Sequence, residues 1–308
     1  MKIAILGAPG CVGRNLIKKL LESPEYEIIA SYREKQDAET LKHERLFWRQ
    51  VDLFDITSAE NFLRGVDVLI YLIHSLGAKD FEFLDVQFAN TAGHAAQHVG
   101  IKKIIYLGGI VPSGKHVSPH LLSRMKTGQA LASYNIPIGE VRASILLATC
   151  SASYLIVYYL AKRLPIMITP RWLNSLCAPI ALEDAVSVLE KLVKRPISGH
   201  ETFEIGSDIV HYRDLLAICG KAIRGVKNFI VPVPLFAVYL SALWIQLITG
   251  VPNSVGIALA EGLRSDTIPS NNRFREVTGR DPIPLESVLK RLAEEMGKKT
   301  GKKSSSKN

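Results

Sequence analysis

Short apolar runs alternate with amphipathic helical patterns through the first half of the chain. Residues 14–21 and 81–99 repeat apolar side chains at the spacing of one helix face. The runs that predict strands lie within residues 3–6, 26–32, 46–55, 66–74, 101–109 and 141–147. Several are apolar almost throughout, which is typical of strands covered by helices on both faces. The alternation therefore predicts an α/β fold with a doubly wound parallel sheet.

A glycine-rich turn, Gly7-x-x-Gly10-x-x-Gly13, follows the first strand directly and opens the first helix. Glycine allows a sharp turn, a close approach of a pyrophosphate to the backbone, and close packing of the helix on the sheet. The helix N-terminus then presents free N–H groups to the phosphates. This predicts a dinucleotide-binding Rossmann domain, and a turn that only packs the helix is the alternative. The expected cofactor contacts in the turn are Gly7, Pro9, Gly10, Cys11, Val12 and Gly13.

The carboxyl ends of the next strands carry further candidate cofactor residues. Arg33 follows the second strand, where NAD-selective enzymes usually place a carboxylate. An arginine would pair with a ribose 2′-phosphate, so NADP(H) is favoured over NAD(H), although a solvated surface arginine is the alternative. Asp52 follows the third strand and could bind the adenine amino group. The remaining candidates at strand ends are Leu53, Leu72, Ile73 and His74. His74 could donate a proton or serve only as a hydrogen-bonded structural residue.

The formal net charge of +9 does not by itself indicate nucleic-acid binding. Several lysines lie in residues 297–308, which lack apolar periodicity and are predicted to form a disordered basic tail. The four cysteines show no metal-binding or redox spacing, so we expect no metal site and unpaired, buried thiols in a reducing compartment. No secretion signal is recognised at the N-terminus, and a cytoplasmic location is expected.

These features together resemble the short-chain dehydrogenase/reductase superfamily, and more narrowly its atypical extended branch. That branch includes NmrA-like proteins and the Rossmann-type accessory subunit of respiratory complex I. The similarity continues beyond the glycine turn, through Arg142-Ala143-Ser144-Ile145, Pro170-Arg171-Trp172 and Thr249-Gly250-Val251-Pro252. The resemblance implies a Rossmann domain that binds NAD(P)(H), either as an oxidoreductase or as a non-catalytic sensor or assembly protein.

The chain departs from the superfamily in the residues that carry its chemistry. Typical members use a serine after the fifth strand and a Tyr-x-x-x-Lys motif on the next helix. Here the serine position is glycine, and the best match to the motif is His120-x-x-x-Arg124. His120 could act as acid or base, or be an ordinary residue of a helix N-terminus. Arg124 could hold a ribose hydroxyl but cannot share a proton at neutral pH. The expected catalytic residues are therefore His120, Arg124 and His74.

Residues 1–148 are predicted to form the Rossmann domain, and residues 149–296 a smaller, mostly helical substrate lobe interleaved with it. Tyr154, Arg171 and Trp172 are the expected substrate contacts. The uncharged run 229–249 contains two prolines near its start, which leaves too few helical residues for a typical membrane span. It is expected to cover a hydrophobic cleft or to contact a membrane surface, with help from the basic tail.

Together these observations predict an NADP(H)-dependent oxidoreductase with a small hydrophobic carbonyl or alcohol substrate. A non-catalytic NAD(P)H-binding sensor or assembly protein is the first alternative, since the usual serine and tyrosine are missing. A sugar-nucleotide epimerase or dehydratase is the second, and it ranks last because such enzymes normally retain Tyr-x-x-x-Lys. The oligomeric state stays open.

Overall fold

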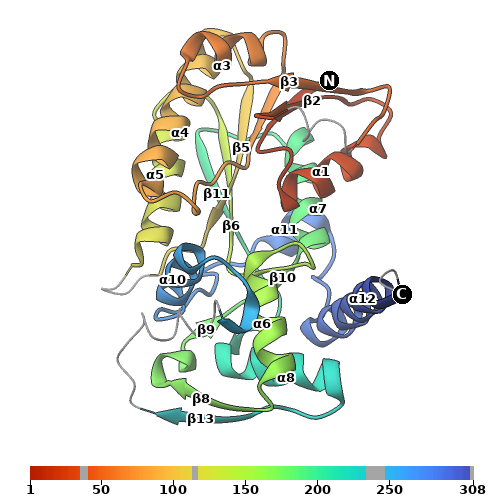
Figure 1. Ribbon diagram of the computed structural model, residues 1–308. Helices are drawn as coiled ribbons and strands as arrows, with labels where there is room; N and C mark the ends of the chain where they lie inside the picture. Colours follow the sequence, from red (N-terminus) through yellow and green to blue (C-terminus); the bar gives the residue numbers. More distant parts are fainter. Residues whose placement is uncertain (35–40, 113–116, 234–246, 306–308) are drawn as a thin grey trace.

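A seven-stranded parallel sheet forms the centre of the protein (Figure 1). The computed structural model describes residues 1–34, 41–112, 117–233 and 247–305. In order across the sheet, the strands are β11 (His200–Ile205), β6 (Ile138–Ala143), β5 (Lys103–Gly109), β4 (Val68–Tyr71), β1 (Lys2–Leu6), β2 (Glu27–Tyr32) and β3 (Leu46–Gln50). In register, Ile5 of β1 lies beside Ala30 on one side and Ile70 on the other. The order of strands confirms the predicted doubly wound Rossmann fold.

Helices cover both faces of this sheet. Alternate residues of a strand point to opposite faces, so an apolar strand contributes side chains to two separate cores. Ile3 and Ile5 belong to the core shared with α1 (Cys11–Leu21) and α7 (Leu182–Lys194). Ala4 and Leu6 belong to the core on the opposite face. That face is covered by α3 (Ile56–Leu63), α4 (Phe81–His98) and α5 (Pro119–Ala132). The helix predicted over 81–99 is thus confirmed.

A second, smaller core lies beyond the carboxyl ends of the strands and is built mainly from helices (Figure 1). Its main helices are α6 (Ala152–Arg163), α8 (Tyr212–Arg224) and α12 (Leu285–Ser305), and α10 (Asn253–Gly262) packs on α5. The helix α11 (Phe274–Thr278) instead packs on α7. Three short strand pairs complete this part: β7 (Leu146–Leu147) with β10 (Ile180–Ala181), β9 (Leu176–Cys177) with β12 (Val210–His211), and β8 (Ile166–Pro170) with β13 (Phe229–Val233). The short helix η1 (Arg171–Asn174) follows β8.

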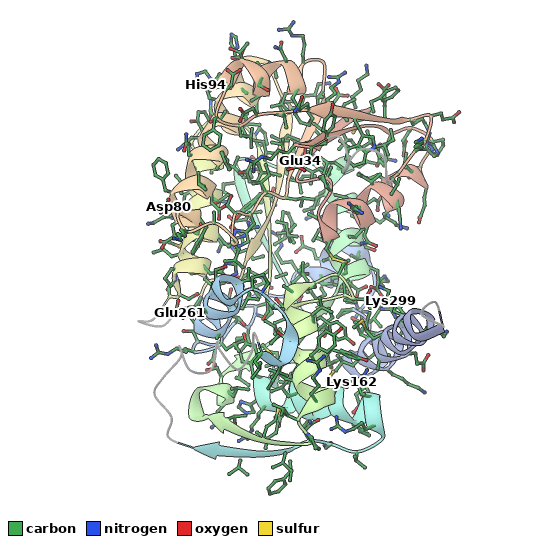
Figure 2. All side chains as sticks on the ribbon, viewed as in Figure 1. Glu34, Asp80, His94, Lys162, Glu261 and Lys299 are labelled. Atoms are coloured by element: carbon green, nitrogen blue, oxygen red, sulfur yellow. A yellow bond between two sulfur atoms is a disulfide. The ribbon has the colours of Figure 1, made fainter. Side chains whose placement is uncertain are left out.

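Two predicted boundaries differ from the structure. The strand expected over 141–147 begins at Ile138 and ends at Ala143, after which the chain pairs with β10 as β7. The tail was expected to be disordered from residue 297, and this is wrong over 297–305, where α12 continues. Lysine favours the helical state. The ammonium of Lys299, a residue labelled in Figure 2, donates a hydrogen bond of 2.9 Å to the Thr149 hydroxyl. Residues 306–308 lie outside the described residues.

A disulfide joins Cys11, the first residue of α1, to Cys150, in the loop before α6 (Figure 2). The prediction of unpaired thiols is therefore wrong for these two cysteines, and correct for Cys177 and Cys219, which are buried and free. The two joined residues are 139 positions apart, with Cα atoms 5.6 Å apart. Only the fold brings them together, so no spacing rule predicts the bond. The bond fixes the start of the glycine-loop helix against the loop that leads into the second core.

Among the described helices, none is long and apolar enough to cross a membrane. Of the uncharged run 229–249, residues 234–246 lie outside the described part of the chain.

Candidate functional site

The glycine turn has the backbone geometry that its sequence predicts. Gly7 has a φ angle of +83°, which side chains rarely allow, and a Cβ there would lie 3.0 Å from the carbonyl group of Leu72. A Cβ on Gly13 would lie 2.5 Å from the carbonyl oxygen of Ala8. The Gly7 N–H donates to the Ser31 hydroxyl at 3.0 Å, which ties the turn to β2. The turn therefore packs too closely for any residue but glycine at positions 7 and 13.

The N-terminus of α1 has the features of a phosphate site. Gly10 caps this helix without a side-chain hydrogen bond, and the first turn contains no acidic residue. The first N–H groups of a helix have no partner within it, so here they can bind an anion. Gly10 itself is exposed, which leaves its backbone open to a ligand. These residues fit the pyrophosphate of a dinucleotide.

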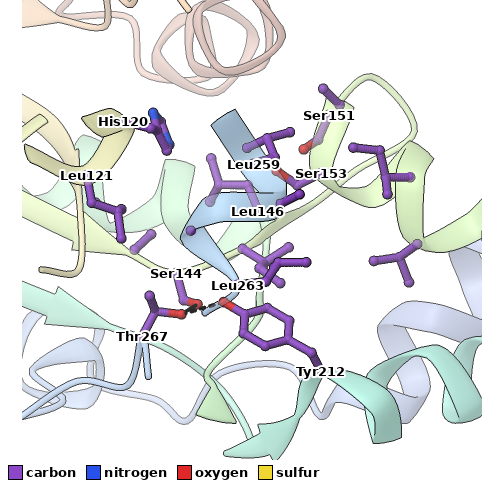
Figure 3. A pocket seen from close by; sticks show the side chains of 18 of the residues that line it. His120, Leu121, Ser144, Leu146, Ser151, Ser153, Tyr212, Leu259, Leu263 and Thr267 are labelled. Carbon is purple, nitrogen blue, oxygen red and sulfur yellow. Dashed lines mark hydrogen bonds between the residues drawn. The ribbon is translucent and has the colours of Figure 1, made fainter. Parts of the chain in front are cut away.

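A cavity of about 860 Å³ starts beside this turn, at Val12 and Leu72, and extends into the second core. Its walls are mainly aliphatic and come from α5, α6, α10 and the strand ends (Figure 3). Representative wall residues are Leu146, Ile156, Leu259 and Leu263. A cavity of this size and lining suits a small hydrophobic ligand.

Two histidines and an aspartate form a connected chain of hydrogen bonds at one end of the cavity. His74 follows β4, and its Nδ1 lies 2.8 Å from Oδ2 of Asp85 in α4. The His74 Nε2 lies 3.0 Å from Nδ1 of His120, which stands at the start of α5. Ser118 caps α5 and Pro119 is its first residue, so the helix start holds His120 at the cavity wall. We call Asp85, His74 and His120 the relay.

The carboxylate of Asp85 is fully buried and well supplied with donors. It accepts from the Ser75 N–H at 2.7 Å and from the Ser123 hydroxyl at 2.9 Å. Burial raises the pKa of Asp85, but the hydrogen bonds from His74, Ser75 and Ser123 outweigh burial, and the pKa lies below its ordinary value. Asp85 is therefore ionised at neutral pH, which makes it the fixed negative end of the relay.

Both histidines of the relay are neutral at neutral pH. Burial lowers the pKa of His74, although its hydrogen bond with Asp85 acts in the opposite direction. Burial, the proximity of His74 and the charge of Arg124 together lower the pKa of His120 to about 3. An ionised Asp85 requires a proton on His74 Nδ1, so the neutral His74 accepts at Nε2. His120 then donates from Nδ1, which leaves its Nε2 as a proton acceptor.

Arg124 lies beside the relay and joins the ends of two strands. Its guanidinium donates to the carbonyl of Ile73 at 3.1 Å and to the carbonyl of Leu107. It also lies 4.9 Å from the centre of the Tyr106 ring. Arg124 is 7 % exposed and forms part of the cavity wall. Arg124 therefore holds the chain after β4 and the end of β5 together at the cavity wall. Its predicted contact with a ribose stays a prediction.

The other predicted cofactor residues have separate surroundings. Arg33 is exposed at the end of β2, available to an anion. Asp52 is also exposed, and its carboxylate accepts from the Phe54 N–H at 2.9 Å, so it shapes its own turn. Leu53 is buried in the core under α3. Pro9 accepts a hydrogen bond from Arg14 through its carbonyl at 2.7 Å.

Of the predicted substrate residues, only the side chain of Tyr154 belongs to the described part of the structure. Tyr154 is fully buried in the second core among residues of α8 and α12, away from the cavity wall. That prediction is wrong because Tyr154 lies on the face of α6 that packs on other helices, whereas Ile156 and Leu160 line the cavity. Arg171 and Trp172 belong to η1, and their side chains lie outside what the structure describes.

Sequence reasoning missed Asp85 and Ser123, which hold the relay in place. A signal for Asp85 exists in the helix 81–98. Asp85 shares its buried stripe with Ala89, Ala92 and Ala96, at helical spacing. A carboxylate on an otherwise alanine face indicates a buried, paired charge. Ser123 follows His120 by three residues, which places both near one face of α5.

Residues 7–157 match a protein family described as NAD(P)H-binding. The whole fold is similar to that of triphenylmethane reductase from Citrobacter sp. in complex with NADP(H), with 19% sequence identity, a TM-score of 0.78, and coverage of 95% of this chain and 100% of that one. An NADPH-dependent quinone oxidoreductase from Escherichia coli complexed with NADPH gives 19% identity, a TM-score of 0.76, and coverage of 94% and 99%. A nucleoside-diphosphate-sugar epimerase from Staphylococcus aureus gives 17% identity, a TM-score of 0.75, and coverage of 94% of this chain and 100% of that one. Identities this low show a shared fold alone. No curated protein matches the sequence.

Proposed function

We propose that the protein is an NADP(H)-dependent oxidoreductase acting on a hydrophobic carbonyl or alcohol, since residues 7–157 match a family described as NAD(P)H-binding. The observation that carries this proposal is the relay, which ends at His120 in the wall of an apolar cavity that begins at the glycine turn. A proton acceptor placed in an apolar cavity beside a dinucleotide site suits the interconversion of an alcohol and a carbonyl.

The cofactor would lie with its pyrophosphate at the N-terminus of α1. When bound, its nicotinamide supplies or accepts the hydride. Arg33 would pair with the ribose 2′-phosphate of NADP(H), and the two fold relatives named with NADP(H) or NADPH support this preference. Arg124 would form the cavity wall beside the nicotinamide half, since it joins the ends of β4 and β5.

The protein's own residues would move the substrate proton. In alcohol oxidation, Nε2 of His120 accepts the hydroxyl proton, while its Nδ1 proton passes to Nε2 of His74. His74 then becomes positively charged beside the buried Asp85 carboxylate, which stabilises that charge. In carbonyl reduction the same protons move in the reverse direction.

Calorimetric titration with NADPH and NADH, followed by turnover assays, tests the proposal. We expect wild-type protein to bind NADPH more tightly than NADH, and Arg33→Asp to lose that preference. We also expect wild-type protein to consume NADPH when menadione or another apolar carbonyl compound is added. Tight NADPH binding without turnover of any such compound would favour the non-catalytic sensor. Failure to bind either nucleotide would contradict both functions.

The sugar-nucleotide epimerase alternative finds less support in the cavity. Its walls are mainly aliphatic, whereas a nucleotide sugar needs many polar partners. Tight binding of UDP-glucose that competes with an apolar ligand would reverse this ranking.

We further propose that the ribbon of β8 and β13 makes a peripheral contact with a membrane. Ile166 and Phe229 are paired in this ribbon and are 66% and 67% exposed, and Val231 of the same ribbon is 37% exposed. Exposed apolar residues close together on a surface indicate an interaction site. Co-sedimentation with anionic phospholipid vesicles tests this contact, and Phe229→Ser is expected to weaken it. Equal sedimentation of both proteins would contradict it.

A further inference from the structure

A second group of polar side chains lines the same cavity, and nothing in the relay uses it. The hydroxyl oxygen of Thr267 lies 2.7 Å from that of Ser144 and 2.8 Å from that of Tyr212 (Figure 3). All three residues line the cavity, and Thr267 and Tyr212 are only 4% and 5% exposed. We call Ser144, Thr267 and Tyr212 the hydroxyl trio.

Three distant segments hold the trio in place through their backbones. Ser144 directly follows β6, at the end of the central sheet. Tyr212 is the first residue of α8, and its N–H donates to the Ser175 carbonyl at 3.1 Å. The Thr267 N–H donates to the Leu176 carbonyl at 2.8 Å. Because Tyr212 and Thr267 are fixed by backbone hydrogen bonds and Ser144 by the end of β6, the trio is a built feature of the cavity and keeps its geometry without a ligand.

The hydroxyl groups of the trio can offer a hydrogen bond to a ligand. The Thr267 hydroxyl bonds to those of Ser144 and Tyr212, and the Tyr212 and Ser144 hydroxyls also interact with each other. Hydroxyl hydrogens rotate to suit their partners, so one O–H group of the trio can turn from its neighbour to an acceptor in the cavity, which all three members line. Burial raises the pKa of Tyr212 well above its ordinary value, so the tyrosine stays neutral. The trio can donate a hydrogen bond but cannot deliver a proton at neutral pH.

A buried donor in an apolar cavity is costly unless a partner satisfies it. We propose that the hydroxyl trio is a specificity subsite that binds a hydrogen-bond acceptor of the substrate, a neutral carbonyl oxygen distinct from the one at His120. The chemical class is therefore an apolar, flat or compact compound with two carbonyl groups, such as a quinone. This inference rests on the proposed function, because it assigns the second polar contact of the same substrate.

Two probes of matched shape test the subsite without any turnover. Menadione carries two carbonyl groups on a methylnaphthalene ring system, and 2-methylnaphthalene carries none. Their dissociation constants are measured by calorimetry in the presence of NADP⁺, which supplies no hydride for reduction. Thr267→Val removes the central hydroxyl and keeps the shape of the side chain. One lost hydrogen bond predicts about fivefold to tenfold weaker binding of menadione. Binding of 2-methylnaphthalene should be unchanged.

Two further variants separate recognition from structure. Tyr212→Phe should reproduce the selective loss, because it removes a second hydroxyl of the trio. Thr169→Val alters another buried threonine of the cavity wall, outside the trio, and should weaken menadione binding less than Thr267→Val does. Equal losses for both probes, or no loss for menadione in either trio variant, would overturn the subsite.

The result is independent of the proposed catalysis. Failure of NADPH binding or of turnover would concern the glycine turn and the relay. A menadione affinity that does not depend on Thr267 or Tyr212 would concern the trio alone. A wild-type protein that binds neither probe would contradict both the subsite and the proposed apolar substrate.

Discussion

The cavity holds two polar clusters that differ in one respect, the presence of a buried charge. The relay contains the Asp85 carboxylate, which is fully buried and lies 2.8 Å from His74. The hydroxyl trio contains no ionised group. A carboxylate stabilises a positive imidazole beside it, so the relay can take up and release a proton. The trio can only hold a neutral group. One cavity therefore separates proton transfer from recognition, and each cluster predicts a different response to substitution.

The largest expected effect is on turnover, at the end of the relay. His120→Gln removes the proton acceptor and keeps a polar side chain of similar size. Loss of a general acid or base typically lowers the rate by about 10²- to 10⁴-fold. NADPH affinity should be unchanged, because the phosphate site lies at α1. Steady-state kinetics and calorimetry on the same samples measure both quantities.

A matched control for this substitution is His98→Gln. His98 ends α4, its side chain is 68% exposed, and it pairs with Glu60 away from the cavity. Its turnover should equal that of the wild type. Equal losses in the two variants, or full activity of His120→Gln, would remove His120 from the mechanism.

The next effect concerns the charge that distinguishes the two clusters. Asp85→Asn keeps the shape of the side chain and removes its negative charge. The imidazolium of His74 then loses its counter-ion, and hydrogen bonds to a charged group contribute about 1.5–3 kcal/mol. We expect turnover to fall by about 10- to 100-fold and the free energy of unfolding to fall as well. Kinetics and denaturant titration measure the two effects.

Asp80→Asn is the control for that variant, since Asp80 is an exposed residue five positions earlier, at the N-cap of α4 (Figure 2). If Asp85→Asn loses stability but keeps the wild-type pH dependence of turnover, Asp85 holds the helix and takes no part in proton transfer.

The sequence predicted the fold and the histidines of the relay better than it predicted the hydroxyl trio. Alternating periodicity and Gly7, Gly10 and Gly13 are local signals, and they correctly predicted the sheet and the NAD(P)H-binding domain. His74 and His120 also became candidates, because each stands at a strand end or helix start. Their contact with each other joins residues 46 positions apart, and no spacing rule predicts it.

The trio could not be predicted from spacing, for a physical reason. Ser144 and Thr267 are 123 residues apart and meet only because the chain returns from the second core to the end of β6. Serine and threonine are common in loops, so neither position stands out in the sequence. The disulfide between Cys11 and Cys150 escaped prediction in the same way. Local patterns thus define strands and turns, whereas contacts between distant loops need the fold.

A smaller effect concerns stability in acid, to which the two histidines of the relay contribute. Burial holds the pKa of His120 at about 3, and an unfolded chain has the ordinary value of 6.5. Between these values the unfolded state binds a proton that the folded state does not, so stability falls as pH falls from about 6.5 towards 3. The lowered pKa of His74 acts in the same direction. One such group changes the free energy of unfolding by at most about 1.4 kcal/mol per pH unit.

Denaturant titrations between pH 4 and pH 8 measure this slope. His120→Gln should reduce it, because the variant has one histidine fewer to protonate on unfolding. The lowered pKa of Asp85 adds a similar loss only below its ordinary value of 3.8, outside most of this range. An unchanged slope in His120→Gln would mean that His120 is accessible to water and protonates freely in the folded state.

The smallest effect distinguishes the trio from the relay by its lack of pH dependence. Ser144→Ala removes one neutral hydroxyl, so we expect KM for a two-carbonyl substrate to rise about twofold to tenfold, with kcat nearly unchanged. The pH profile of kcat should keep its shape, because no trio member titrates near neutral pH and burial raises the pKa of Tyr212 further. Steady-state kinetics from pH 6 to pH 8 measure both parameters. A shifted pH profile in this variant would mean that the two clusters exchange protons, and the separation between recognition and proton transfer would then be wrong.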